Sequence, residues 1–283
     1  MSRLTLFHVG FLFLILFFTT TAKAQKEAET FNVDSTLYEY YQRCQEYLLE
    51  PVVLSMSDTL FRMAGERHDE RMQAVAIATQ LDYYYFQGTN EDSVIHYTNK
   101  VKEFAKATHQ PKYYYFAWAN RLITYYLKTS RTNIALYEVQ NMLKEAQEED
   151  DKTGLSRCYN IMSQIYTIKR FDSMAFEWRL KEIELTEKYK IENYNISQTY
   201  AQIANYYISQ KKQKEALRAV EKAVSTANSS TQQISAKLEY VNYYSKFGDF
   251  QAAEKILKEC QIAFEQDKRL ESIKKRLYNI ECL

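Results

Sequence analysis

Hydrophobic and small residues recur along this chain in a pattern that indicates paired helices. The first half of each copy places a large residue, a small residue and a tyrosine on one helical face. The second half places small residues where a partner helix must approach closely. The clearest copy consists of Tyr200, Ile203, Ala204, Tyr207, Ala216, Val220 and Ala223. Each copy therefore predicts one helical hairpin.

The copies follow one another with a period near forty residues. Their second helices align on six anchors, Met56, Val94, Ala135, Ala175, Ala216 and Ala253, which are separated by 38, 41, 40, 41 and 37 residues. A period of this length, carrying two amphipathic helices, is typical of a stacked α-solenoid. Low glycine and proline counts, 5 and 2, also favour an all-α fold.

Turn and capping signals divide the chain. The first predicted hairpin begins near Asp34 and the third at Pro111. The second, fourth and fifth span about residues 69–106, 155–188 and 193–227, and the sixth follows Asn228. Gly248 and Asp249 are expected to end one helix of the last hairpin and to cap the next. The predicted organisation is a signal peptide at 1–24, a short leader at 25–34, the repeat array at 35–267 and a capping helix at 268–283.

The first 24 residues have the pattern of a secretory signal. Arg3 precedes the apolar run Leu4–Phe18, and Ala22-Lys23-Ala24 forms a small-x-small cleavage site. We therefore expect export to the periplasm, with an uncleaved anchor in the inner membrane as the alternative. No later apolar stretch approaches the length of a membrane span, so none is expected in the mature chain.

Charge and cysteine usage further limit the kinds of partner and of covalent cross-link that we expect. The predicted signal peptide holds two of the 37 basic residues and none of the 36 acidic ones, so the mature chain is close to neutral and no nucleic-acid partner is expected. Cys44 and Cys260 occupy small-residue positions and are predicted to be buried; a Cys260–Cys282 disulfide is the alternative.

These hairpins resemble tetratricopeptide repeats (TPRs) over about residues 36–265. The fifth and sixth copies match best, the first three are degenerate, and Glu182 replaces the usual last alanine of the fourth. The resemblance implies a right-handed α-solenoid of about six TPR-like hairpins with a C-terminal capping helix. Export combined with repeats is also similar to the periplasmic TPR input regions of bacterial sensor histidine kinases.

The resemblance further implies a concave groove lined by the first helices. The residues at its lining positions are Asn120, Thr124, Arg157, Asn160, Gln164, Gln198, Asn205 and Asn242. Side-chain amides dominate this set, and amides can bond the backbone of an extended peptide. The sequence therefore predicts a protein or peptide ligand. The alternative is a concave surface that is only hydrated. Tyrosine pairs such as Tyr206-Tyr207 either pack between hairpins or line the groove.

No catalytic, metal-binding or cofactor-binding pattern is present in the sequence. The three histidines after the leader, His68, His96 and His109, lie near no recognisable nucleophile, and phosphate-binding glycine loops are missing. We therefore expect a non-enzymatic exported scaffold without a cofactor, which binds a protein partner and serves as an input module in signalling. The alternative is a self-assembling structural scaffold of the cell envelope.

Overall fold

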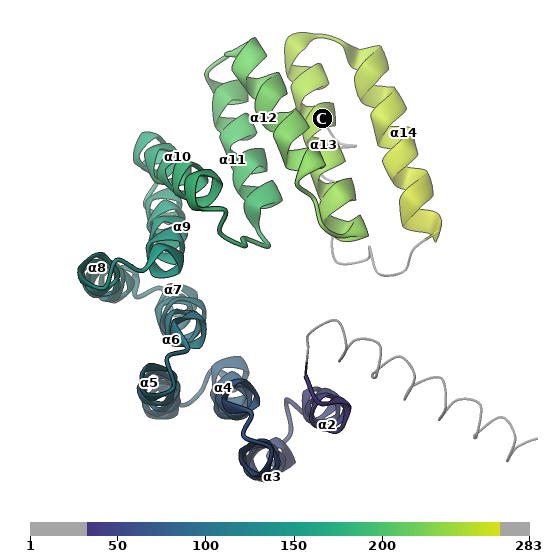
Figure 1. Ribbon diagram of the computed structural model, residues 1–283. Coiled ribbons are helices and arrows are strands. Elements are labelled where there is room, and N and C mark those ends of the chain that lie inside the picture. Colours follow the sequence, from purple (N-terminus) through teal and green to yellow (C-terminus); the bar gives the residue numbers. More distant parts are fainter. Residues whose placement is uncertain (1–32, 267–283) are drawn as a thin grey trace, which may run out of the picture. The chain divides into compact units, whose positions relative to one another are not determined.

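The computed structural model describes residues 33–266 (Figure 1). They form two compact units, 33–138 and 139–266, and each is described by itself. The division falls inside one helix, α8 (Thr132–Glu148). The predicted signal peptide, most of the leader and the capping helix lie outside the described residues.

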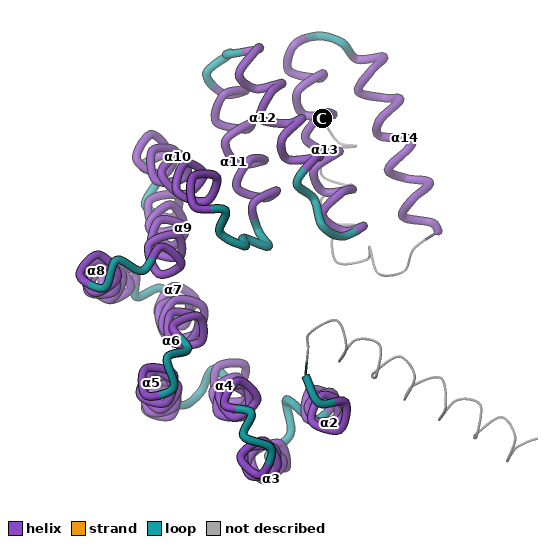
Figure 2. The backbone as a smooth tube through the Cα atoms, viewed as in Figure 1, coloured by secondary structure: helices purple, strands orange, loops and turns teal. Residues whose placement is uncertain are grey.

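Consecutive helices pair into the six predicted hairpins. Helices α2 (Ser35–Glu46) and α3 (Val52–Glu66), then α4 (Glu70–Gln87) and α5 (Glu91–Ala107), form the first two. The third consists of α6 (Pro111–Ala117), η1 (Trp118–Ile123) and α7 (Thr124–Lys128), followed by α8. The last three are α9 (Lys152–Ile168) with α10 (Asp172–Tyr189), α11 (Ile196–Ser209) with α12 (Gln213–Ser225), and α13 (Ser230–Phe247) with α14 (Phe250–Gln266). The part of the chain that the structure describes contains no strand (Figure 2).

The second helices α3, α5, α8 and α10 each bury one stripe of four positions, spaced 4, 3 and 4 residues apart, and α12 and α14 bury part of the same stripe. In α5 these are Val94, Thr98, Val101 and Ala105, and in α8 they are Ala135, Val139, Met142 and Ala146, all 0% exposed. The first hairpin corrects the predicted anchor, because the stripe of α3 begins at the buried Val53 and Met56 is only partly buried. Val53 and Val94 are 41 residues apart, which makes the period more regular than the sequence alignment indicated.

Left-handed residues end most of the helices. From His68 to Lys211 they follow one another every 20 or 21 positions, and only Gly88 among them is a glycine. The next amide then bonds back five residues, as in Asp69 N to Ala64 O and Lys212 N to Tyr207 O, both 2.9 Å. This is the Schellman ending, which satisfies carbonyls that the helix leaves open. Most connections are consequently only three residues long.

Aromatic pairs pack within and between hairpins. Tyr84 stacks on Tyr97, and Tyr206 stacks on Phe176 of the preceding hairpin with ring centroids 4.0 Å apart. Tyr115 and Trp118 are 0% and 5% exposed. In this region the tyrosines serve packing, since a buried ring cannot line a groove.

Two further findings concern predicted features. Among the described residues, no helix has both the length and the apolar character that crossing a bilayer requires. Cys44 and Cys260 are buried as predicted, and burial raises the pKa of each thiol to about 11. Cys282, and with it the alternative disulfide, lies outside the described residues.

Candidate binding site

One second helix, α10, carries charged residues at two positions of the buried stripe, where α3, α5, α8 and α12 carry apolar or hydroxyl side chains. In α10 the four stripe positions are Ala175, Arg179, Glu182 and Thr186. Arg179 is 8% exposed and Glu182 is 1% exposed, yet the matching positions of α8 are Val139 and Met142. Burying two ionisable groups costs free energy unless each is held by polar partners. The fourth hairpin therefore contains a polar core where its neighbours have an apolar one.

Glu182 is held by side chains from both sides of α10. Its carboxylate accepts bonds from Asn160 Nδ2 of α9 at 3.2 Å and from Asn193 Nδ2 at 2.8 Å, and Thr199 Oγ1 of α11 donates at 3.4 Å. Burial raises the pKa of Glu182 above its ordinary value, although these donors and nearby Arg179 oppose that shift. The carboxylate thus joins α9, α10 and α11 through hydrogen bonds.

Arg179 lies one turn before Glu182 and bonds to neutral groups. Its Nε–H donates to Gln202 Oε1 of α11 and its Nη2–H to Thr167 Oγ1 of α9, both at 2.7 Å. Among the described residues, no carboxylate lies within ion-pair distance of this guanidinium. Burial lowers the pKa of Arg179, but the group remains cationic because its ordinary pKa is far above neutrality.

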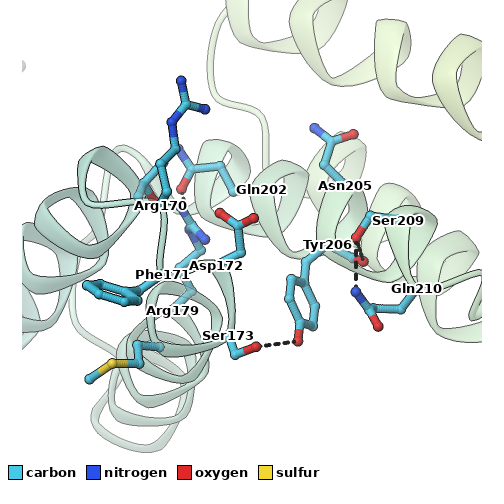
Figure 3. A pocket seen from close by; sticks show the side chains of 12 residues that line it. Arg170, Phe171, Asp172, Ser173, Arg179, Gln202, Asn205, Tyr206, Ser209 and Gln210 are labelled. Atoms are coloured by element: carbon cyan, nitrogen blue, oxygen red, sulfur yellow. Dashed lines mark hydrogen bonds between the residues drawn. The ribbon is translucent and has the colours of Figure 1, made fainter.

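A pocket of about 670 Å³ adjoins Arg179, between the α9–α10 turn and α11 (Figure 3). Exposed residues form much of its rim, including Phe171, Met174 and Asn205. The hydroxyl of Tyr206 lies 3.4 Å from Ser173 Oγ. The complete lining consists of Thr167, Arg170, Phe171, Asp172, Ser173, Met174, Arg179, Gln202, Asn205, Tyr206, Ser209 and Gln210. Its size suits a side chain with adjoining backbone.

The structure distributes the predicted groove residues over several settings. Asn205 lines the pocket, and Gln198 is exposed two turns earlier on α11. Asn160 bonds Glu182, and Gln164 Nε2 donates to Asn160 Oδ1 at 2.7 Å, so these two amides serve the polar core. Asn242 Nδ2 likewise donates to Glu239 Oε2, at 2.8 Å.

The remaining three predicted residues are not among those that line this pocket. Arg157 is partly buried in α9, and burial lowers its pKa. Asn120 and Thr124 belong to the other unit, in and just after η1, a π-helical turn that the sequence did not predict. The π turn lets Thr124 Oγ1 donate to Ala119 O, five residues back, at 2.9 Å. Peptide binding by any of the eight residues remains a prediction.

Sequence reasoning missed Arg179 and Gln202. The signal was present, because Arg179 stands four residues after the anchor Ala175, where the aligned copies carry Thr98, Val139 and Val220. Within the described ranges, no group of three or more histidine, cysteine, aspartate or glutamate side chains could hold a metal ion.

Comparisons with known proteins show the fold. A scan against protein-family models finds no match, and a search of curated proteins finds none either. Among solved structures, the chain is similar to BtubC (BKLC) from P. vanneervenii, with a TM-score of 0.58, 14% identity, and 86% of this chain and 93% of that chain covered. It is also similar to the apo form of RapI, with a TM-score of 0.56, 11% identity, and 93% and 78% covered.

The chain is therefore an all-α solenoid of TPR-like helical hairpins, as the period predicted. Identities this low show a shared fold and nothing about ligands. The similarity to input regions of sensor kinases stays a prediction.

Proposed function

We propose that this protein is a non-enzymatic, exported scaffold that binds a protein or peptide partner through the polar face of its first helices. In the second unit this face includes Gln198 and Asn205 of α11, beside the pocket at Arg179. A role as an input module in signalling is part of the same proposal, since ligand binding would be its first step.

The observation that carries this proposal is the polar core of α10 next to an open pocket. The fold does not require Arg179 at its position, because valine fills the matching site in α8 and α12 with 0% exposure. A buried cation placed where the repeat accepts an apolar residue, and adjoining a pocket rather than solid packing, is better explained by ligand binding than by stability.

The test is affinity capture from an envelope extract. We expect the double variant Q198A/N205A to lose a partner that the wild-type chain retains, because both amides are exposed and their loss leaves the core intact. The matched control is Q213A/Q251A, which removes two exposed amides from second helices. Equal recovery by all three chains would refute binding through this face.

Two accompanying measurements check the rest of the proposal. Cell fractionation should place the chain outside the cytoplasm with its first 24 residues removed, and retention of the full-length chain in the cytoplasm would contradict export. Light scattering of the purified chain should give a mass that is independent of concentration. Self-association without any captured partner would favour the structural scaffold instead.

A further inference from the structure

The guanidinium of Arg179 has unused hydrogen-bonding capacity beside the pocket. Arginine carries five N–H donors in a planar arrangement. In Arg179 the Nε–H and one Nη2–H, which form one edge of the plane, are taken by Gln202 and Thr167. The other edge, formed by Nη1 and the second Nη2–H, makes no hydrogen bond to any described residue. Two parallel donors therefore remain on a side chain that is only 8% exposed.

The charge around this edge favours an anionic group. Arg170 and Arg179 contribute two positive charges to the lining, and Asp172 contributes one negative charge. Asp172 makes no ion pair with either arginine within the described chain, and Glu182 is held by Asn160, Asn193 and Thr199 outside the lining. Glu182 and Asp172 act on Arg179 electrostatically, but neither carboxylate bonds its guanidinium. An anion that reached the guanidinium would be attracted to it, and the hydrogen bonds formed would offset the desolvation of both charges.

The free edge suits an oxyanion, and its surroundings favour one that belongs to a peptide. Two parallel N–H groups match two oxygens of a carboxylate or a phosphate, which bind arginine in a bidentate manner. Around it, Gln202 and Asn205 offer amide groups that can bond peptide backbone, and Phe171 and Met174 are 52% and 41% exposed at the rim. Ile168, in the preceding turn, is a further 52% exposed apolar residue. A partner segment with apolar residues beside an acidic residue would therefore fit this rim.

We propose that the pocket receives an aspartate or glutamate side chain of the partner, with its carboxylate on the free edge of Arg179. This inference rests on the proposed partner-binding function and adds the chemistry of the residue that is recognised. The recognising arginine lies at a core position of a second helix, so it is distinct from the eight residues predicted for the groove of first helices.

The test uses blocked tripeptides as probes and nuclear magnetic resonance of the labelled chain. Acetyl-Gly-Glu-Gly-amide should shift the side-chain amide signals of Gln202 and Asn205, and acetyl-Gly-Gln-Gly-amide should bind at least tenfold more weakly. Inorganic phosphate distinguishes a carboxylate site from a general anion site. Phosphate binding as tight as that of the glutamate peptide, or absence of binding by that peptide, would overturn the inference.

Variants assign the effect to Arg179. R179M keeps the aliphatic stem and should abolish the shifts, and R179K keeps the charge but loses the planar edge, so it should bind at least fivefold more weakly. R218M removes an exposed arginine of α12 and should bind as the wild type does. Far-UV circular dichroism verifies that each variant is folded.

The same variants separate this inference from the proposed function. A partner captured equally by the wild type and R179M, but lost by Q198A/N205A, would refute the role of Arg179 and leave partner binding in place. Loss of the partner in R179M, with retention in R218M, would support both.

Discussion

Replacing Arg179 by methionine should leave the protein about as stable as the wild type. The substitution removes the charge of a residue that is 8% exposed, and it keeps a chain of similar length against α9 and α11. The two groups that Arg179 bonds do not become buried and unpaired, because Thr167 is exposed and Gln202 is partly exposed. Thr167 Oγ1 also retains its bond to Ser163 O at 2.8 Å.

The expected change in stability is the difference between opposing contributions. Removing a buried charge recovers a desolvation cost of several kcal/mol. Against this, two hydrogen bonds are lost, each with a net value of about 1.5–3 kcal/mol when one member is charged, and Glu182 loses the attraction of a nearby cation. These contributions nearly cancel, because both hydrogen-bond partners regain water, so we expect the free energy of unfolding of R179M to lie within about 1 kcal/mol of that of the wild type.

Urea unfolding followed by circular dichroism measures this difference, and hydrogen exchange of α9, α10 and α11 locates it. The exposed-site control R218M should lie within about 0.5 kcal/mol of the wild type. A loss of more than about 1 kcal/mol in R179M, at an unchanged denaturant slope, would mean that Arg179 serves stability, and the argument that it is kept for a ligand would fail.

Three other outcomes follow from the structure. The pKa of Glu182 is raised in the folded chain above its ordinary value of 4.5, so the wild type loses stability as pH rises above that value and the carboxyl ionises. E182Q lacks this ionisation and should gain stability relative to the wild type between about pH 4.5 and 7.5, as measured by urea titrations. A difference that does not change with pH contradicts this. Lys211 has a left-handed φ of 57°, which glycine adopts without strain, so K211G should raise the free energy of unfolding by about 0.5 kcal/mol. K214G, in α12, should lower it by about 1 kcal/mol. Calorimetry that shows both variants destabilised would speak against strain at the turn. Cys44 and Cys260 should react with a thiol reagent only after urea is added, given their burial and raised pKa, and rapid labelling of the native chain would show that these segments open.

The regular part of the fold was predictable because the small-residue stripes repeat. Ala135, Ala175 and Ala216 are each fully buried, and the helix boundaries predicted from Pro111 and Gly248 agree with the structure to within about a residue. The anchor Met56 was misplaced because the first copy lacks alanine at the start of its stripe, where Val53 stands instead.

The turns were less predictable, for a physical reason. Left-handed residues ordinarily reveal themselves as glycine, but His109, Ser130 and Arg170 adopt that conformation here without being glycine. The Schellman bonds and the packing of the hairpins enforce it, and neither can be read from a local sequence.

The candidate site was predictable only in part. Asn205 is exposed and lines the pocket, whereas Asn160 belongs to the network of a buried carboxylate, and a ligand-binding role of either residue stays a prediction. That network depends on Glu182 and Asn193, which approach Asn160 only after α9 and α10 pack together. Glu182 was noted as a departure from the repeat, but its partners come from across the hairpin and leave no periodic signal.

The short connections bear on how a protease would meet this chain. A cleavage site needs a stretch of backbone that can extend into an enzyme, and links of three residues closed by hydrogen bonds offer none. The links at 47–51, 190–195 and 226–229 are longer, and the last two lie on either side of the hairpin that carries Asn205. Brief digestion would thus cut at these three links, and two of the cuts would release the hairpin that supplies Gln202 and Asn205 to the pocket.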